Sequence, residues 1–582
     1  MARPQATPRA IAVARGDEPA DLLITGGRVF SPATREWVDT ALAVADGFVA
    51  GWGERDAQER MDVGGAALTP AFVDAHMHLE STKLWIDEFV RSVLPHGTTA
   101  IAADPHEIAN VLGVPGIAAL TEAAAPLPFT FGVYASSCVP ASPFESAGAS
   151  LDAGDVRELI ERHGARGVAE VMNFPGVIAG DPEMLARIAA AGHRRVDGHS
   201  PGVAGRSLDA YLAAGAESDH ETTRVEDGHE RRQKGMWLFI RQGSASQNLR
   251  ALIPDVVEHG PDLAAFCTDD REPDTLLRQG HLNDCARLAA EAGVSEVDAL
   301  LLASTNPASY HGFHQLGSLG PGHQADVLCF DELGSWRPAR VWQAGRLVAE
   351  RGEIVPGAVP SAPVPELMRG TVRLGTPPSA ERLALAHPDG TRVRAVGVES
   401  RSLTTLAREL TLGEPGADVA HAAVVERHRE SGRIGLGYAV GFGLRRGAMA
   451  STVAHDAHNC VTVGALAPGG PGDMAAAVAR LAELGGGQVA VLDGRVVAEV
   501  PLPLAGLMSE LPAAEVAAQI RELNRAAADA LGVTLEEPFM QLSFLALSVI
   551  PELRLTDGGL VDVGEFAYVP VEVSGPNTPS GS

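Results

Sequence analysis

Between residues 66 and 315, short apolar runs alternate with longer stretches that are rich in alanine and leucine. The apolar runs end in polar residues, as buried strands do when they emerge at the edge of a sheet. The clearest of these runs are 67–74, 98–103, 168–172, 195–198 and 264–267. Alternating strands and helices over about 250 residues predict an α/β fold, a TIM-like (β/α)8 barrel spanning 66–315.

The regions on both sides of this barrel share a different pattern. Apolar segments with glycine turns at 22–30 and 41–52 predict β-hairpins, and a similar sequence pattern recurs at 340–349. Because the two regions flank the barrel in the chain, we predict that 21–65 and 316–355 together build one small composite β-sandwich.

Three further segments complete the predicted organisation. Residues 1–20 are rich in Arg, Ala and Pro and predict a disordered tail. Residues 356–368 follow a proline-rich pattern that is typical of a linker. Residues 369–582 mix strand signals with a helix pattern near 513–531, which predicts a separate C-terminal α/β domain.

Composition narrows the classes of function. The formal net charge of −28 disfavours binding to nucleic acid or to anionic lipid surfaces, whereas a neutral small substrate is unaffected. The longest strongly apolar stretch, 539–553, contains polar residues and is shorter than the roughly 20 residues of a membrane span. Five scattered cysteines, with no Cys-x-x-Cys pair, indicate a reducing compartment, so we expect a cytoplasmic protein.

Polar residues of metal-binding type follow the predicted barrel strands. In the Asp-Ala-His-Met-His segment, His76 and His78 point to the same side of a strand and can bind one ion together. A single histidine is more often structural, but here each polar residue lies where barrel enzymes collect catalytic groups. The predicted metal ligands are His76, His78, Glu170, His199, His220 and Asp269.

Six protein ligands are too many for one tetrahedral zinc centre, which uses three ligands and a water. We therefore expect two ions. His76, His78 and Asp269 would bind one ion, His199 and His220 the other, and Glu170 would bridge them. Such a pair lowers the pKa of a shared water from 15.7 towards about 7, and Asp269 would take its proton and pass it to a leaving nitrogen. The pattern predicts hydrolysis at an electron-poor carbon.

Several motifs resemble a known family. The segments 68–78, 306–313 and 317–327 look like the barrel-opening and barrel-closing signatures of the amidohydrolase superfamily. More narrowly, the chain resembles adenine deaminases from residue 22 to its end. The motifs that carry this closer resemblance are 104–111, 170–173, 197–202, 218–221, 267–271, 450–459 and 502–509.

The resemblance implies an aminohydrolase that acts on a cyclic amidine, converting adenine and water to hypoxanthine and ammonia. A hydroxide shared by two divalent ions, Mn²⁺ or Fe²⁺ with Zn²⁺ as an alternative, would attack C6 of the purine. Such an enzyme serves purine salvage and adenine catabolism. We also expect a homo-oligomer, a dimer.

Further side chains are candidates for the acid that delivers a proton to the purine ring. They are Asp270, His106 and Glu107, although Asp270 could instead form a salt bridge with Arg271. His455 and His458 are additional candidate metal ligands, and the alternative for both is a hydrogen-bonded loop.

Two other functions stay open at this point. The same barrel could act on a cyclic amide or on an N-acetyl sugar phosphate, because a glutamate ligand also occurs in N-acetylglucosamine-6-phosphate deacetylases. A non-catalytic scaffold is disfavoured because no ligand is missing.

Overall fold

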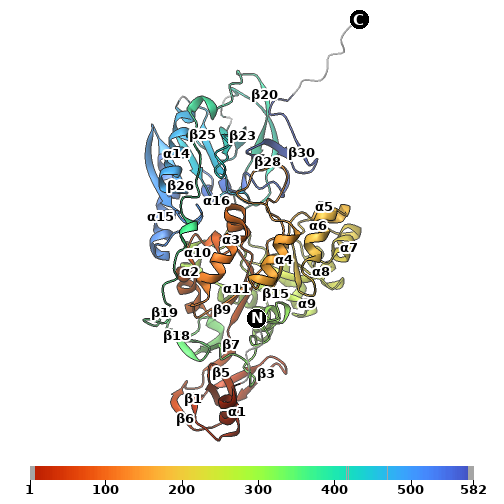
Figure 1. Ribbon diagram of the computed structural model, residues 1–582, viewed down its shortest axis with the longest axis vertical. Coiled ribbons are helices and arrows are strands. Elements are labelled where there is room, and N and C mark those ends of the chain that lie inside the picture. The colour runs from red at the N-terminus through yellow and green to blue at the C-terminus, as the bar shows by residue number, and fades with distance from the viewer. Residues whose placement is uncertain (1–6, 401, 415, 417, 468, 574–582) are drawn as a thin grey trace.

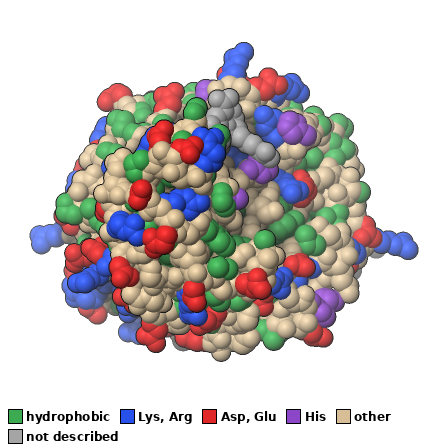
Figure 2. Space-filling view, turned by 90° about the horizontal axis from the view of Figure 1, so that it is seen from below, with side chains coloured by type: hydrophobic (Ala, Val, Ile, Leu, Met, Phe, Trp, Pro, Cys, Tyr) green, Lys and Arg blue, Asp and Glu red, His purple; other side chains and the backbone are tan. Residues whose placement is uncertain are grey.

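The computed structural model describes residues 7–400, 402–414, 416, 418–467 and 469–573. Three bodies follow one another along its long axis, with the N-terminal β-structure at one end, the barrel in the middle and the C-terminal domain at the other end (Figure 1). None of the helices in these ranges combines the length and the apolar character needed to cross a membrane. On the face shown in Figure 2, acidic and basic side chains are interspersed.

Eight parallel strands form the central ring. Parallel pairing runs from β8 to β10, from β11 to β12 and from β13 to β15. A parallel bridge between Ala135 and Val168 joins β10 to β11, and one between Met77 and Asp269 joins the ends of β8 and β15. The strands are β8 (Phe72–Met77), β9 (Thr98–Ala103), β10 (Thr130–Val133), β11 (Gly167–Val171), β12 (Arg195–Gly198), β13 (Ser218–Asp219), β14 (Trp237–Arg241) and β15 (Ala264–Cys267). The prediction of a TIM-like barrel is confirmed.

The strands are almost wholly buried because helices cover the outside of the ring. In β8, β9 and β11, every residue is buried, as expected for parallel strands that are covered on both faces. The covering helices include α3 (His106–Ala124), α4 (Ala153–Arg162), α7 (Gly205–Ala214), α8 (Val225–Gln233), α9 (Leu249–His259) and α11 (Leu282–Glu291). The carboxyl ends of the strands form the barrel mouth, which faces the C-terminal domain (Figure 1).

The N-terminal β-structure combines strands from both flanks of the barrel. A seven-stranded sheet has the order β19-β18-β17-β16-β7-β2-β3, and a four-stranded sheet has the order β5-β4-β1-β6. Its strands before the barrel are β1 (Ala20–Thr25), β2 (Arg28–Ser31), β3 (Glu36–Asp39), β4 (Leu42–Ala45), β5 (Phe48–Trp52), β6 (Ala57–Asp62) and β7 (Ala67–Pro70), and those after it are β16 (Val327–Phe330), β17 (Arg340–Gln343), β18 (Arg346–Glu350) and β19 (Glu353–Ile354).

The predicted disordered tail is wrong for the part of it that the structure describes. Residues 1–6 lie outside the described residues, but Pro8–Arg15 form helix α1, which is capped by the Thr7 hydroxyl. Arg9 forms ion pairs with Asp21, at 2.5 Å, and Asp46, at 2.8 Å. These contacts hold the helix against the sheet, and a composition rich in Arg, Ala and Pro does not reveal them.

The C-terminal domain is built on an eight-stranded sheet with the order β21-β20-β23-β22-β25-β24-β26-β27. Its strands are β20 (Arg392–Gly397), β21 (Leu406–Thr411), β22 (Val419–Val425), β23 (Ile434–Val440), β24 (Ala448–Ser451), β25 (Cys460–Ala465), β26 (Gly487–Leu492) and β27 (Arg495–Pro501). Helices α14 (Gly470–Leu484), α15 (Ala513–Ala526) and α16 (Pro538–Phe544) pack against it, and β28 (Leu553–Thr556), β29 (Gly559–Asp562) and β30 (Ala567–Tyr568) form a small sheet. The loop 452–459, between β24 and β25, reaches the barrel mouth.

Candidate active site

All six predicted metal ligands lie at the barrel mouth. His76 is in β8 and Glu170 is in β11, while the other four follow directly or within two residues after the ends of β8, β12, β13 and β15. Each of the six is at most 5% exposed. Because the carboxyl ends of parallel strands meet at one rim, residues nearly 200 positions apart converge here.

Glu170 lies at the centre of the cluster. Its Oε2 atom is 2.7 Å from His199 Nδ1 and 3.2 Å from His220 Nε2. Its Oε1 atom is 3.3 Å from His78 Nε2. The two carboxylate oxygens therefore face different histidines, which is the arrangement expected of a bridging carboxylate.

Asp269 closes the opposite side of the cluster. Its Oδ1 atom is 3.0 Å from His78 Nε2 and 3.4 Å from His76 Nε2. The guanidinium of Arg241, the last residue of β14, donates to Asp269 Oδ2 at 2.5 Å and to both carboxylate oxygens of Glu221, at 2.7 and 2.8 Å. Arg241 thus fixes one oxygen of Asp269 and leaves the other directed at the histidines.

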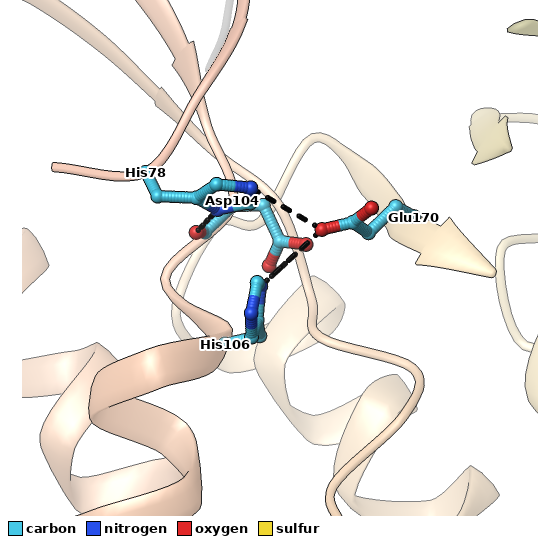
Figure 3. Close-up of side chains that lie close together, drawn as sticks. All are labelled: His78, Asp104, His106 and Glu170. Carbon is cyan, nitrogen blue, oxygen red and sulfur yellow. Dashed lines mark hydrogen bonds and ion pairs between the residues drawn. The ribbon is translucent and has the colours of Figure 1, made fainter. Parts of the chain in front are cut away.

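The donor set fits divalent ions. The Nδ1 atom of His78 is 3.0 Å from the backbone carbonyl oxygen of Asp104, so it carries the ring proton and leaves Nε2 as a lone pair (Figure 3). The Nε2 atoms of His76 and His78 face each other at 3.3 Å and share Asp269 Oδ1. A metal-binding histidine commonly donates its other ring N–H to a carbonyl or a carboxylate. Clusters of three or four ligand atoms within 4.8 Å of one another occur here, such as His76, His78 and Asp269.

Electrostatics in this cluster favour charged carboxylates. Burial raises the pKa of Glu170, but the neighbouring His199 and His220 outweigh burial and lower the pKa well below its ordinary range. Burial likewise opposes ionisation of Asp269, and Arg241, His76 and His78 lower its pKa well below the usual value. Both carboxylates are therefore anionic at neutral pH and suited to binding cations.

The three acid candidates occupy different places. His106, the first residue of α3, lies beside the cluster, with Nδ1 3.3 Å from Asp104 Oδ2 and 3.4 Å from Glu170 Oε1 (Figure 3). Asp270 lines the cavity at the barrel mouth and is hydrogen-bonded to the Ser81 hydroxyl. Glu107 is fully buried, accepts from the same hydroxyl at 2.7 Å and is not part of the cavity wall.

The alternative interpretation of Asp270 as a partner of Arg271 is wrong. Arg271 is buried and pairs with Asp284, at 2.8 Å, and it also donates to two backbone carbonyls. Burial and the adjacent Asp269 carboxylate raise the pKa of Asp270. A carboxyl group with a raised pKa at the cavity wall can hold a proton for donation.

The C-terminal domain forms the roof of the cavity. His455 and Asp456 come from loop 452–459, and the His455 ring stacks on Phe544 with ring centroids 5.2 Å apart. Apolar side chains also line the cavity. These side chains are Met172, Leu403, Phe544, Leu547 and Ile550.

Sequence reasoning missed several of these residues. Arg241 ends a barrel strand, so the rule that identified the metal ligands could also have found it. Phe544 and Leu403 carry no such signal, because they reach the cavity only through the packing of the C-terminal domain on the barrel.

Comparison with known proteins places the chain in a family. A family model described as "Amidohydrolase family" matches residues 67–348, and one described as "Adenine deaminase C-terminal domain" matches 399–567. Adenine deaminase 2 of Carboxydothermus hydrogenoformans is 40% identical over 573 residues, covering 97% of this chain and 99% of that protein. The adenine deaminase of Desulfatibacillum aliphaticivorans is 42% identical over 570 residues, covering 96% of this chain and 98% of that protein.

The chain belongs to the adenine deaminase family. The resemblance inferred from the motifs is therefore confirmed. As an amidohydrolase, this adenine deaminase family member has a barrel mouth at which divalent metal ions are expected, and the His, Asp and Glu clusters lie at that mouth.

Proposed function

We propose that this protein hydrolyses adenine to hypoxanthine and ammonia with two divalent ions held by His76, His78, Glu170, His199, His220 and Asp269. The observation that carries the proposal is the convergence of these six side chains around Glu170 in a chain that aligns with adenine deaminases over nearly its full length. When bound, the ions supply Lewis acidity that makes water nucleophilic at neutral pH.

The chain's own residues divide the proton transfers between them. Asp269 keeps one oxygen fixed by Arg241, and its other oxygen accepts the proton of the attacking water and returns it to the departing amino group. Asp270 donates a proton to a ring nitrogen, which stabilises the tetrahedral adduct at C6. We assign this role to Asp270 because Glu107 does not reach the cavity wall.

The lining of the cavity combines apolar and polar side chains, as a site for a heteroaromatic base requires. The apolar side chains of Met172, Leu403 and Phe544 line it together with the polar cluster, so a purine can bury one side against carbon atoms while its polar edge meets Asp270 and the ions.

Several finer proposals accompany this function. We propose Mn²⁺ or Fe²⁺ as the ions, because imidazole and carboxylate ligands suit both, with Zn²⁺ as an alternative. We propose a role in purine salvage and adenine catabolism and a homodimer on the resemblance to the family, and a cytoplasmic location on the five scattered cysteines. The proposed domain limits are 21–65 with 316–355, 66–315 and 369–582. Strand β7 (Ala67–Pro70) departs from these limits, because it pairs with β2 and β16 in the N-terminal sheet, and the first barrel strand begins only at Phe72.

Ammonia release tests the function directly. The protein is loaded separately with Mn²⁺, Fe²⁺ and Zn²⁺ and is assayed with adenine, adenosine and hydantoin. Stoichiometric ammonia and hypoxanthine from adenine support the proposal. Turnover of hydantoin without ammonia release from adenine would instead favour a cyclic amidohydrolase.

A further inference from the structure

A second cluster of ligand atoms lies on the far side of His106 from Glu170. His106 belongs to the barrel helix α3, whereas His455 and Asp456 belong to loop 452–459 of the C-terminal domain. One ligand atom from each of these three residues lies within 4.8 Å of the other two. All three side chains are buried.

Two polar atoms of this cluster have no hydrogen-bond partner among the described residues. They are Nε2 of His106 and Oδ2 of Asp456, and both are shielded from solvent. An unpaired buried polar atom destabilises the folded state, and a charged one does so more strongly. Such atoms are rare in native proteins, and an ion or a water is the usual explanation.

The orientation of His106 suits metal binding. Its Nδ1 atom faces Asp104 Oδ2 at 3.3 Å, and the other Asp104 oxygen accepts from the Ser136 hydroxyl at 3.1 Å. Nδ1 therefore carries the ring proton and directs it at the Asp104 carboxylate, which leaves a lone pair on Nε2. This tautomer is the one found in carboxylate-histidine-metal arrangements.

The spacing also suits an ion. His106 Nε2 is 3.4 Å from Asp456 Oδ1, which is longer than a good hydrogen bond. Two ligands that are each about 2.1 Å from one tetrahedral ion lie about 3.4 Å apart. The stack of His455 on Phe544 holds the third ring at the same place.

We propose that His106, His455 and Asp456 form a third divalent-cation site, which links the barrel to the C-terminal domain. Two imidazoles and one carboxylate with an open position suit Zn²⁺ or Fe²⁺. This site goes beyond the proposed deaminase, which requires only the ions around Glu170, so either proposal can fail without the other.

His458, a ligand candidate from the sequence, is not part of this site. Its Nδ1 atom accepts the backbone N–H of Ala454 at 3.2 Å, so the proton of the neutral ring is on Nε2. That atom faces Glu107 Oε2 at 3.4 Å. Neither His458 Nε2 nor Glu107 Oε2 has a hydrogen-bond partner among the described residues, but the proton on Nε2 leaves that atom without a lone pair for an ion. Asp456, rather than His458, therefore completes the cluster with His106 and His455.

Zinc stoichiometry tests the proposal. The full chain is stripped with a chelator, loaded with excess ZnCl₂, desalted and measured by inductively coupled plasma mass spectrometry. Wild type should retain three zinc ions per chain, and Asp456→Asn and His455→Asn should each retain two. The control Asp262→Asn removes a carboxylate that is 88% exposed, and it should retain three.

Each outcome decides the question. Two ions in wild type would overturn the site and would indicate that a protonated His106 simply contacts Asp456. Three ions in both loop variants would place the third ion elsewhere and would overturn it as well. Retention of two ions by the loop variants also shows that these chains have folded around Glu170.

Discussion

Replacing Glu170 with glutamine should nearly abolish turnover while leaving the fold intact. In wild type, one carboxylate oxygen of Glu170 faces His199 at 2.7 Å and the other faces His78 at 3.3 Å. Glutamine has the same shape, but it carries no charge and replaces one of these two oxygens with an NH₂ group. Charged hydrogen-bond partners are worth about 1.5–3 kcal/mol each. Losing two of them costs about 3–6 kcal/mol, which corresponds to a decrease of about 10²- to 10⁴-fold in kcat.

The assay measures ammonia released from adenine, together with the metal content and the melting temperature of each variant. Glu258→Gln is the matched control, because Glu258 is 77% exposed, and it should behave as wild type. If Glu170→Gln kept two ions and a kcat within about threefold of wild type, Glu170 would not bridge the ions and the assignment would be refuted.

Three further changes test the neighbouring residues. Asp269→Asn should lower kcat much more than it changes KM, since proton transfer is needed only in the transition state, and an unchanged kcat would move this role elsewhere. Arg241→Lys should lower kcat about tenfold or more, because one ammonium cannot hold both Glu221 and Asp269, and wild-type kinetics would contradict this. Asp197 lies in β12, two residues before His199, and its carboxylate accepts hydrogen bonds from the hydroxyls of Ser218 and Tyr310. Burial raises the pKa of Asp197 to about 7, above the unfolded value of about 3.9. Between about pH 3.9 and about pH 7, Asp197 is therefore protonated in the folded state and ionised in the unfolded state. The free energy of unfolding consequently decreases as the pH rises from the lower to the higher of these two pKa values. The free energy of unfolding of the metal-free protein is measured with urea at pH 5 and at pH 7. It should decrease between these pH values by about 2 kcal/mol more in wild type than in Asp197→Asn, and equal decreases would refute the raised pKa of Asp197.

The barrel and its ligands could be predicted because the relevant signals are local. A buried strand that ends in polar residues is visible in the chain itself, and the alternation in Asp-Ala-His-Met-His places His76 and His78 on one side. Arg241 shows the same signal at the end of β14, although a single arginine in an apolar strand is easily overlooked.

The roof of the cavity could not be predicted in the same way. Asp456 meets His106 only because the C-terminal domain packs on the barrel mouth, and these two residues are 350 positions apart in the chain. No periodicity encodes such a contact. Helix α1 illustrates the same limit, because Arg9 is held by Asp46, a residue in a turn between two later strands.

The central claim is that six side chains around Glu170 hold a pair of ions. A crystal of the manganese-loaded protein, measured on both sides of the manganese absorption edge, tests it most directly. Two anomalous peaks are predicted, one beside His76, His78 and Asp269 and the other beside His199 and His220, with Glu170 between them. Anomalous density absent from this cluster in an enzyme that still releases ammonia from adenine would contradict the claim.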